Sequence, residues 1–232
     1  MRKRFLCLLL GLLCLTALLP AHGRAADAAD VRAIADGIVA WKKADNGATA
    51  DGFLLNDAFL ALAGTTPGDW YPIGLSRLGV EDRYDAYLAV LRDQVEERYR
   101  QPGALSAAKA TEWHRIALAV LAAGGDPASF GTDGDGQPIG LMADRTYNRG
   151  WQTSLGRQGI NGWIWGLIAL DSMRYELPDD AFYTREDILL EILCRQLADG
   201  GFALSGTTAD PDITAMAVQA LAPYYNTETG YT

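Results

Sequence analysis

Four segments of the chain share one pattern of hydrophobic and polar positions and can be aligned without a gap. Each is ten residues long, and they begin at Asp69, Glu112, Asn161 and Asp212. In every segment the first position is an acid or its amide, positions five and seven are apolar, position six is small and position ten is leucine. Apolar helices can align by chance, but agreement in all four segments at two separate positions favours a true repeat.

The repeated pattern is that of a buried helix. Positions six and ten lie four residues apart and share one helix face, where the small residue lets a neighbouring helix approach closely. The polar first residue is a candidate N-cap, because its side chain can accept hydrogen bonds from the free amides of the first turn. Since the segments are apolar nearly all round, we expect four helices that are each buried on more than one side.

More amphipathic helices are predicted in the sequence around these segments. One spans residues 29–44 and a second spans 81–100, with a charged outer face. A third begins at Thr184, where Thr184 and Asp187 approximate a capping box, and ends before Gly200. The four repeats start 43, 49 and 51 residues apart, which fits one helical hairpin per repeat. With no strand pattern in the sequence, we predict an all-α protein of polar outer and apolar inner helices.

Residues 132–157 interrupt this series and predict a long loop, with a short helix near Leu141. The loop opens with Thr132–Pro138, whose aspartates resemble a calcium-binding loop. Pro138 stands where an EF-hand requires glycine, so we interpret the segment as a plain turn.

Residues 1–25 predict a secretory signal peptide. A run of three basic residues at Arg2–Arg4 precedes an apolar stretch that reaches Pro20, and small residues up to Ala25 offer cleavage positions. The alternative is an uncleaved membrane anchor, but the apolar stretch is shorter than the ~20 residues that a bilayer span needs. We therefore expect an exported protein, extracellular or on the cell surface.

Composition narrows the possible partners. The chain of 232 residues has 20 basic and 29 acidic residues and a net charge of −9, so it lacks the basic surface that a phosphate backbone requires, and we expect no nucleic-acid partner. Beyond the predicted signal peptide the chain has one cysteine, Cys194, and one histidine, His114. These exclude an internal disulfide and a cysteine-rich zinc site, and we expect no metal. Cys194 lies within the predicted helix that begins at Thr184, and we expect it in the core.

Two adjacent motifs resemble a known family. Residues 196–202 read QLADGGF, and residues 210–221 read DPDITAMAVQAL. Together they are similar to the prenyltransferase and squalene-oxidase repeat, and the segment 157–171 is similar to secreted bacterial members of unassigned role. The superfamily includes terpene cyclases, protein prenyltransferase β subunits and the helical domain of cobalamin-carrier proteins. The resemblance is clearest over residues 111–225.

The resemblance implies an α/α toroid, in which six inner helices are ringed by six outer helices and the ligand lies in a central funnel. Residues 26–225 would form this domain and residues 226–232 a tail. At the observed repeat spacing, the chain supplies about four to five of six hairpins. We therefore expect an incomplete toroid, closed by missing C-terminal hairpins or by another subunit, and of the two we favour a fragment of a longer protein.

Asp212 is the catalytic candidate. The segment that contains it resembles the motif with which terpene cyclases protonate an alkene or epoxide, and Asp212 matches the proton donor of that motif. Ile213 stands where those cyclases have a second acid, which favours the simpler interpretation of Asp212 as a helix cap. A protein prenyltransferase would need a zinc site of Asp, Cys and His, which the sequence does not offer.

Aromatic residues gather at the starts of the repeated segments and are the candidate ligand-binding residues. If these starts point to one mouth, the aromatic rings form a belt around a shared cavity, with polar neighbours that orient a ligand. The alternative is ordinary core packing, because large aromatic side chains dominate protein cores. The aromatic candidates are Trp70, Tyr71, Trp113, Trp163 and Trp165, and the polar ones are Asp69, Glu112, His114 and Arg115.

Three functions follow from these patterns. The first is an exported binding module that holds a small flat or apolar ligand in its funnel, with a corrinoid as one possible ligand. The second is a terpene cyclase of the squalene type that uses Asp212 as its proton donor. The third is a structural or adhesive surface domain without a ligand. We adopt the first as the working hypothesis.

Overall fold

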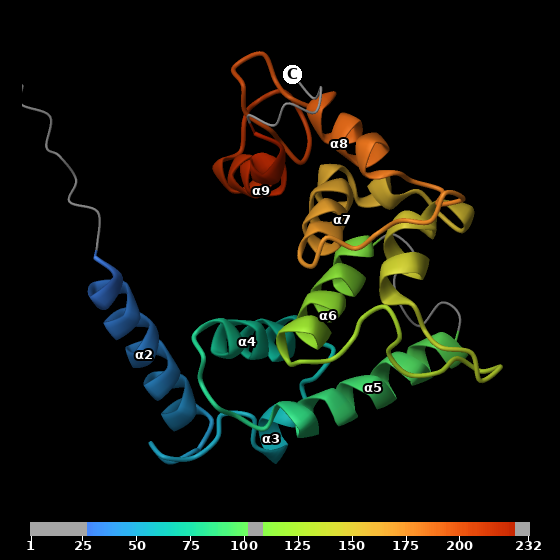
Figure 1. Cartoon of the computed structure of the whole chain (residues 1–232). Helices are drawn as coiled ribbons and strands as arrows, with labels where there is room; N and C mark the ends of the chain where they lie inside the picture. Colours follow the sequence, from blue (N-terminus) through green and yellow to red (C-terminus); the bar gives the residue numbers. More distant parts are fainter. Residues whose placement is uncertain (1–26, 102–108, 226–232) are drawn as a thin grey trace, which may run out of the picture. The chain divides into compact units, whose positions relative to one another are not determined.

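The computed structural model describes residues 27–101 and 109–225, and within these ranges it is mostly α-helical and contains no strand. One isolated bridge joins Thr132 and Pro138. The all-α prediction is confirmed (Figure 1). The predicted signal peptide and the predicted tail lie outside the described residues. The main helices are α2 (Ala28–Asp45), α3 (Asp57–Leu60), α4 (Thr66–Arg77), α5 (Tyr84–Arg100), α6 (Ala110–Ala122), α7 (Ile160–Asp171), α8 (Arg185–Leu193) and α9 (Pro211–Leu221).

The chain divides into two compact units within α2, between Trp41 and Lys42. The first unit is described from residue 27 and consists of the larger part of α2. No residue of this helix is buried. Val31, Ile34, Ile38 and Trp41 recur at helical spacing along it, and each is more than half exposed. The predicted helix 29–44 is confirmed, and its apolar residues form a stripe along the helix.

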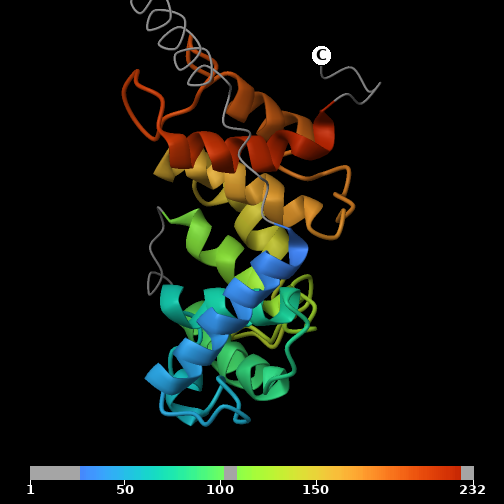
Figure 2. The same cartoon turned by 90° about the vertical axis from the view of Figure 1, so that its left-hand side faces the viewer.

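The second unit is built on the four repeated segments, which form α4, α6, α7 and α9. These inner helices pack in chain order, α4 on α6, α6 on α7 and α7 on α9 (Figure 2). The outer helix α8 packs on α7. The outer helix α5 buries a stripe at i, i+4 and i+8 that consists of Tyr87, Leu91 and Val95. The repeat identified in the sequence therefore corresponds to one row of consecutive neighbouring helices.

The inner helices begin earlier than the sequence predicts, and the first residues of the repeats are not N-caps. In α4 the cap is Thr65, whose side chain accepts from the amide of Gly68 at 3.3 Å. In α9 the cap is Asp210, whose carboxylate accepts from the amides of Asp212 and Ile213. Both helices have proline within their first two positions, where its missing N–H costs nothing. These prolines precede the predicted start of each helix, and they mark the position at which each helix begins in the structure.

The small sixth position of the repeat allows close packing in three of the four helices. Ala117, Gly166 and Ala217 are buried in α6, α7 and α9. A Cβ built on Gly166 would lie 3.1 Å from Leu155 Cδ2, so this position holds α7 against the preceding segment. In α4 the equivalent Gly74 is exposed, and an added Cβ would meet no atom within 4 Å. The side of α4 that carries Gly74 is therefore open within the second unit.

The predicted capping box of α8 is confirmed, but the prediction for Cys194 is wrong. Thr184 Oγ1 accepts from the amide of Asp187, and the Asp187 carboxylate accepts from the amide of Thr184. The helix ends at Leu193, and Cys194 follows it as an exposed residue. The buried side of α8 carries Ile188 and Ile192. Cys194 lies two residues beyond Ile192 and so points to the opposite side of the helix.

The predicted loop 132–157 packs more tightly than its composition suggests. Ile139, Leu141 and Met142 within it are buried, and short helical turns follow at Ala143–Tyr147, Arg149–Trp151 and Leu155–Gln158. The turn predicted at its start is confirmed, because Asp133 Oδ1 accepts from the amides of Asp135 and Gln137 at 2.9 and 2.8 Å.

Candidate functional site

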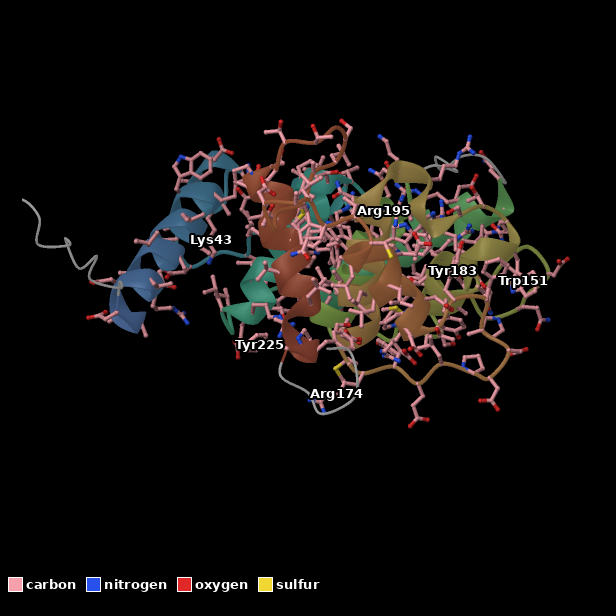
Figure 3. All side chains as sticks on the ribbon, turned by 90° about the horizontal axis from the view of Figure 1, so that it is seen from above. Lys43, Trp151, Arg174, Tyr183, Arg195 and Tyr225 are labelled. Carbon is pink, nitrogen blue, oxygen red and sulfur yellow. The ribbon has the colours of Figure 1, made fainter. Side chains whose placement is uncertain are left out.

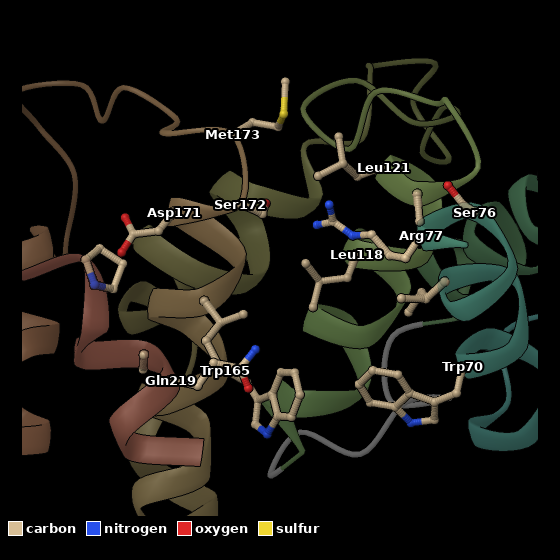
Figure 4. Close-up of a pocket in the computed structure, with 15 residues that line it drawn as sticks. Trp70, Ser76, Arg77, Leu118, Leu121, Trp165, Asp171, Ser172, Met173 and Gln219 are labelled. Carbon is tan, nitrogen blue, oxygen red and sulfur yellow. The ribbon is translucent and has the colours of Figure 1, made fainter. Parts of the chain in front are cut away.

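A cavity of about 880 Å³ lies between the inner helices, and we call it the inner cavity. Figure 4 shows its side chains converging from α4, α6, α7 and α9. The outer helices α5 and α8 contribute no residue to it. Position eight of the repeat lines the cavity in three of the four inner helices. Its lining residues are Trp70, Ile73, Ser76, Arg77, Leu118, Leu121, Ala122, Trp165, Ile168, Asp171, Ser172, Met173, Gln219, Ala220 and Pro223.

Two tryptophans from different helices meet at one end of the cavity. The rings of Trp70 in α4 and Trp165 in α7 pack edge to face, with centroids 5.5 Å apart. Trp70 is 40% exposed and Trp165 is half-buried. This arrangement leaves ring surface open to the cavity, and such surface suits a flat or apolar molecule. Two members of the predicted aromatic belt are therefore brought together.

The other predicted aromatic residues lie elsewhere. Tyr71 packs edge to face on Phe59, 5.8 Å between centroids, with the Lys42 ammonium over its ring. Trp113 is buried, with Tyr99 5.4 Å away and the Arg145 guanidinium 4.5 Å above its ring. The single belt around one mouth is thus not formed, because consecutive inner helices present different sides to the cavity.

Trp163 belongs to a chain of rings that leads away from the cavity. It is buried and packs edge to face on Tyr183, with centroids 5.0 Å apart. Tyr183 contacts Phe182, and Phe182 contacts the exposed Trp151. Figure 3 shows Tyr183 and Trp151 on the same flank of the structure. Trp163 therefore anchors the loop before α8, which is the core-packing alternative considered for it.

Asp69 and Arg115 form a buried cluster that holds α4, α5 and α6 together. Arg115 Nε donates to Asp69 Oδ2 at 2.8 Å. Asp69 Oδ1 accepts from the hydroxyl of Tyr87 at 2.7 Å and from the amide of Gly64 at 2.8 Å. Arg115 also donates to the carbonyl of Gly64 and to the hydroxyl of Thr66. Every charge in the cluster is compensated, so these residues act in folding and do not meet a ligand in the inner cavity.

The cluster also changes the titration of its neighbours. Burial and the carboxylate of Asp69 raise the pKa of the Tyr87 phenol above its usual range. Burial lowers the pKa of Arg98, whose guanidinium donates to the carbonyl of Gly64 at 2.9 Å. These shifts result from the removal of water around the cluster.

His114 and Glu112 do not reach the inner cavity either. His114 is 1% exposed, and its Nε2 lies 3.2 Å from the carbonyl of Arg145. Burial lowers the pKa of His114 to about 3, and the imidazole is neutral at pH 7. Glu112 is half-buried and lies 3.8 Å from the ammonium of Lys109.

Asp212 is exposed near the start of α9, where its amide donates to the capping Asp210. The residues of α9 that line the inner cavity, Gln219 and Ala220, lie at the other end of the helix. Asp212 therefore lies outside this cavity, whereas a carboxylic acid that protonates an alkene needs an enclosed apolar surrounding.

The polar residues of the inner cavity were not identified from the sequence. Arg77 ends α4, and it makes no ion pair or hydrogen bond with any residue that the structure describes. Asp171 ends α7, and its carboxylate accepts from Arg185 Nε and from the Tyr224 hydroxyl, both at 2.8 Å. A signal existed, because Arg77 directly follows Ser76 and Asp171 lies three residues after Ile168, and Ser76 and Ile168 are the position-eight residues that line the cavity.

A search of protein families, of curated proteins and of solved structures found no match to the chain. Among the described residues, no group of three or more His, Cys, Asp or Glu side chains could hold a metal ion. No helix in residues 27–101 or 109–225 is long and apolar enough to span a bilayer. The inner cavity is therefore the candidate functional site.

Proposed function

We propose that this protein is an exported binding module that holds a small flat or apolar ligand in the inner cavity. The observation that carries the proposal is the pair Trp70 and Trp165, whose open ring surface lies in a cavity built by all four inner helices. A volume of about 880 Å³ is in the range of cavities that bind drug-sized molecules. The signal peptide predicted at residues 1–25 supports export to the cell surface or beyond.

The row of inner helices supports an incomplete α/α toroid. Its inner helices would face a common funnel, and the lining of the inner cavity by α4, α6, α7 and α9 agrees with that arrangement. Gly74 on α4 is exposed, and Val218 on α9 is 58% exposed. These exposed positions on the first and last inner helices are consistent with a row that is open at both ends. We propose that further hairpins or another subunit complete the ring.

The binding function is tested with a neutral apolar fluorophore, N-phenylnaphthylamine. The chain should bind it with a saturable increase in dye fluorescence. The double variant Ser76→Gln, Ala122→Gln fills the cavity from α4 and α6 and should abolish the saturable signal. The matched control, Ala128→Gln with Ser129→Gln, adds the same side chains at exposed positions outside the cavity and should bind as the unaltered chain does.

Two outcomes contradict the proposal. Equal binding by the cavity-filled variant would place the dye elsewhere, and no saturable binding by the unaltered chain would favour a structural or adhesive domain. The corrinoid version has its own test, in which the chain is incubated with cobalamin and passed over a gel-filtration column. A protein peak without cobalamin excludes that ligand and leaves the binding of other apolar molecules to the first experiment.

A further inference from the structure

The charges of the inner cavity indicate the chemistry of its ligand. We infer that the ligand is an apolar organic acid, whose flat body lies on Trp70 and Trp165 and whose anionic group pairs with Arg77. This inference rests on the proposed binding function and adds to it a defined second contact.

Arg77 is the uncompensated charge among the residues that line the cavity. Its guanidinium extends from the end of α4 into the space bordered by Leu118 and Leu121 of α6 (Figure 4). No carboxylate among the described residues pairs with it, in contrast to Arg115 on the neighbouring helix. Arg77 is exposed and hydrated in the free protein, and an anionic group whose apolar body lies in the cavity beside it can exchange that water for a charge-assisted hydrogen bond.

Asp171, the acid in the same cavity, is already neutralised. Arg185 Nε donates to its Oδ1 and the Tyr224 hydroxyl donates to its Oδ2. Arg185 is held in place by a second bond to the carbonyl of Leu170 at 3.0 Å. Because Asp171 has its own cation, it neither compensates Arg77 nor repels an anion as a free carboxylate would. The lining therefore favours a negative ligand group over a positive one.

The spacing along the helices sets the size of the ligand. Arg77 lies seven residues after Trp70 in α4, which is two helical turns on the same face and about 10 Å along the axis. Ser172 follows Trp165 at the same interval at the end of α7. The aromatic surface and the cation are thus at two levels of one cavity. A molecule with a two-ring body and one carboxylate or sulfonate group spans this distance.

Two fluorophores that differ by one sulfonate test the inference directly. Anilinonaphthalene sulfonate carries the anion, and N-phenylnaphthylamine is the same ring system without it. The unaltered chain should bind the sulfonate more tightly. Arg77→Gln should weaken sulfonate binding about tenfold and change binding of the neutral dye much less, because only the sulfonate pairs with the guanidinium. Arg77→Lys should keep part of the affinity, because it keeps the charge without the planar guanidinium.

The control is Arg157→Gln, which removes an exposed arginine outside the cavity and should change neither affinity. Raising the salt concentration should weaken binding of the sulfonate and not of the neutral dye. If Arg77→Gln binds the sulfonate as tightly as the unaltered chain while the neutral dye still binds, the inference is overturned and the proposed function stands. If neither dye binds in the cavity, the proposed function fails as well.

Discussion

Arg115 and Arg77 lie on adjacent inner helices, and their surroundings are opposite. Arg115 is buried in α6 and donates to a carboxylate, a hydroxyl and a carbonyl, and its partner Asp69 is fully buried. Arg77 is exposed at the end of α4, borders the inner cavity and has no such partner among the described residues. One cation is part of the folded core and the other is available to a ligand.

The contrast separates structural from functional polar residues in this fold. A buried charge remains only where partners compensate the loss of water, and the three partners of Arg115 all lie within residues 64–69 around the start of α4. An uncompensated charge that keeps its water costs the fold little and can exchange that water for a ligand. The sequence candidates Asp69 and Arg115 belong to the first kind, and Arg77 belongs to the second.

The largest expected effect is that of Arg115→Gln. Removing the guanidinium leaves the carboxylate of Asp69 buried without its cation, which should lower the free energy of unfolding by about 3–5 kcal/mol. Urea unfolding measures the loss. The control is Arg83→Gln, which breaks an ion pair with the 92% exposed side chain of Asp57 and should cost about 1 kcal/mol or less. Similar losses in both variants would show that the buried ion pair contributes no more to stability than the exposed one.

The second prediction concerns pH and His114. Its pKa is lowered from 6.5 in the unfolded chain to about 3 in the folded one, so only the unfolded chain takes up this proton between those values. The stability contributed by the neutral histidine is therefore complete above pH 6.5 and falls as the pH decreases through that window, by up to about 1.4 kcal/mol per pH unit.

Urea unfolding at a series of pH values tests this. His114→Met, which has no titrating group, should show a shallower loss of stability toward low pH than the unaltered chain. Identical pH slopes would mean that the pKa of His114 is the same in the folded and the unfolded chain.

Arg185→Gln should lower the stability by an intermediate amount and should also weaken binding of the anionic dye. The pair with Asp171 is partly exposed, at 25% and 16% of the two side chains, so we expect a loss of about 1 kcal/mol. The freed carboxylate adds a negative charge to the inner cavity and should weaken binding of anilinonaphthalene sulfonate several-fold. A dye titration measures this, and unchanged sulfonate binding would contradict the electrostatic account of the cavity.

The smallest effect on stability is expected for Arg77→Gln. Its side chain has no ion pair to lose among the described residues, so the free energy of unfolding should change by no more than about 0.5 kcal/mol. Urea unfolding measures whether Arg77 stabilises the fold, and the dye titrations measure whether it binds the anionic group. A loss of several kcal/mol would mean that Arg77 supports the fold as Arg115 does.

Much of the secondary structure was predictable because it depends on local patterns. The helical spacing of apolar residues in α5, the capping box of α8 and the repeat of the inner helices are all properties of short segments. The errors came where a longer-range partner decides the outcome. Cys194 was expected in the core from its place in an amphipathic stretch, but the buried face of α8 passes through Ile188 and Ile192.

The candidate site was predictable only in part. Trp70 and Trp113 occupy the same second position of the repeat, yet Trp70 lines the inner cavity while Trp113 is 2% exposed. The reason is that α6 has α4 on one side and α7 on the other, and the segment 143–147 packs on it as well. A helix that is apolar all round carries no local mark of which side will face a cavity.

The helices, the repeat and the small residues at its sixth position could be recognised from the sequence, because each depends on spacing within one segment. The contact between Trp70 and Trp165, the ion pair of Arg115 and the place of the cavity follow from tertiary packing. Those outcomes depend on which faces of different helices pack together. The helices α6 and α7 are buried over most of their length, so their own sequences do not show which face lines the cavity.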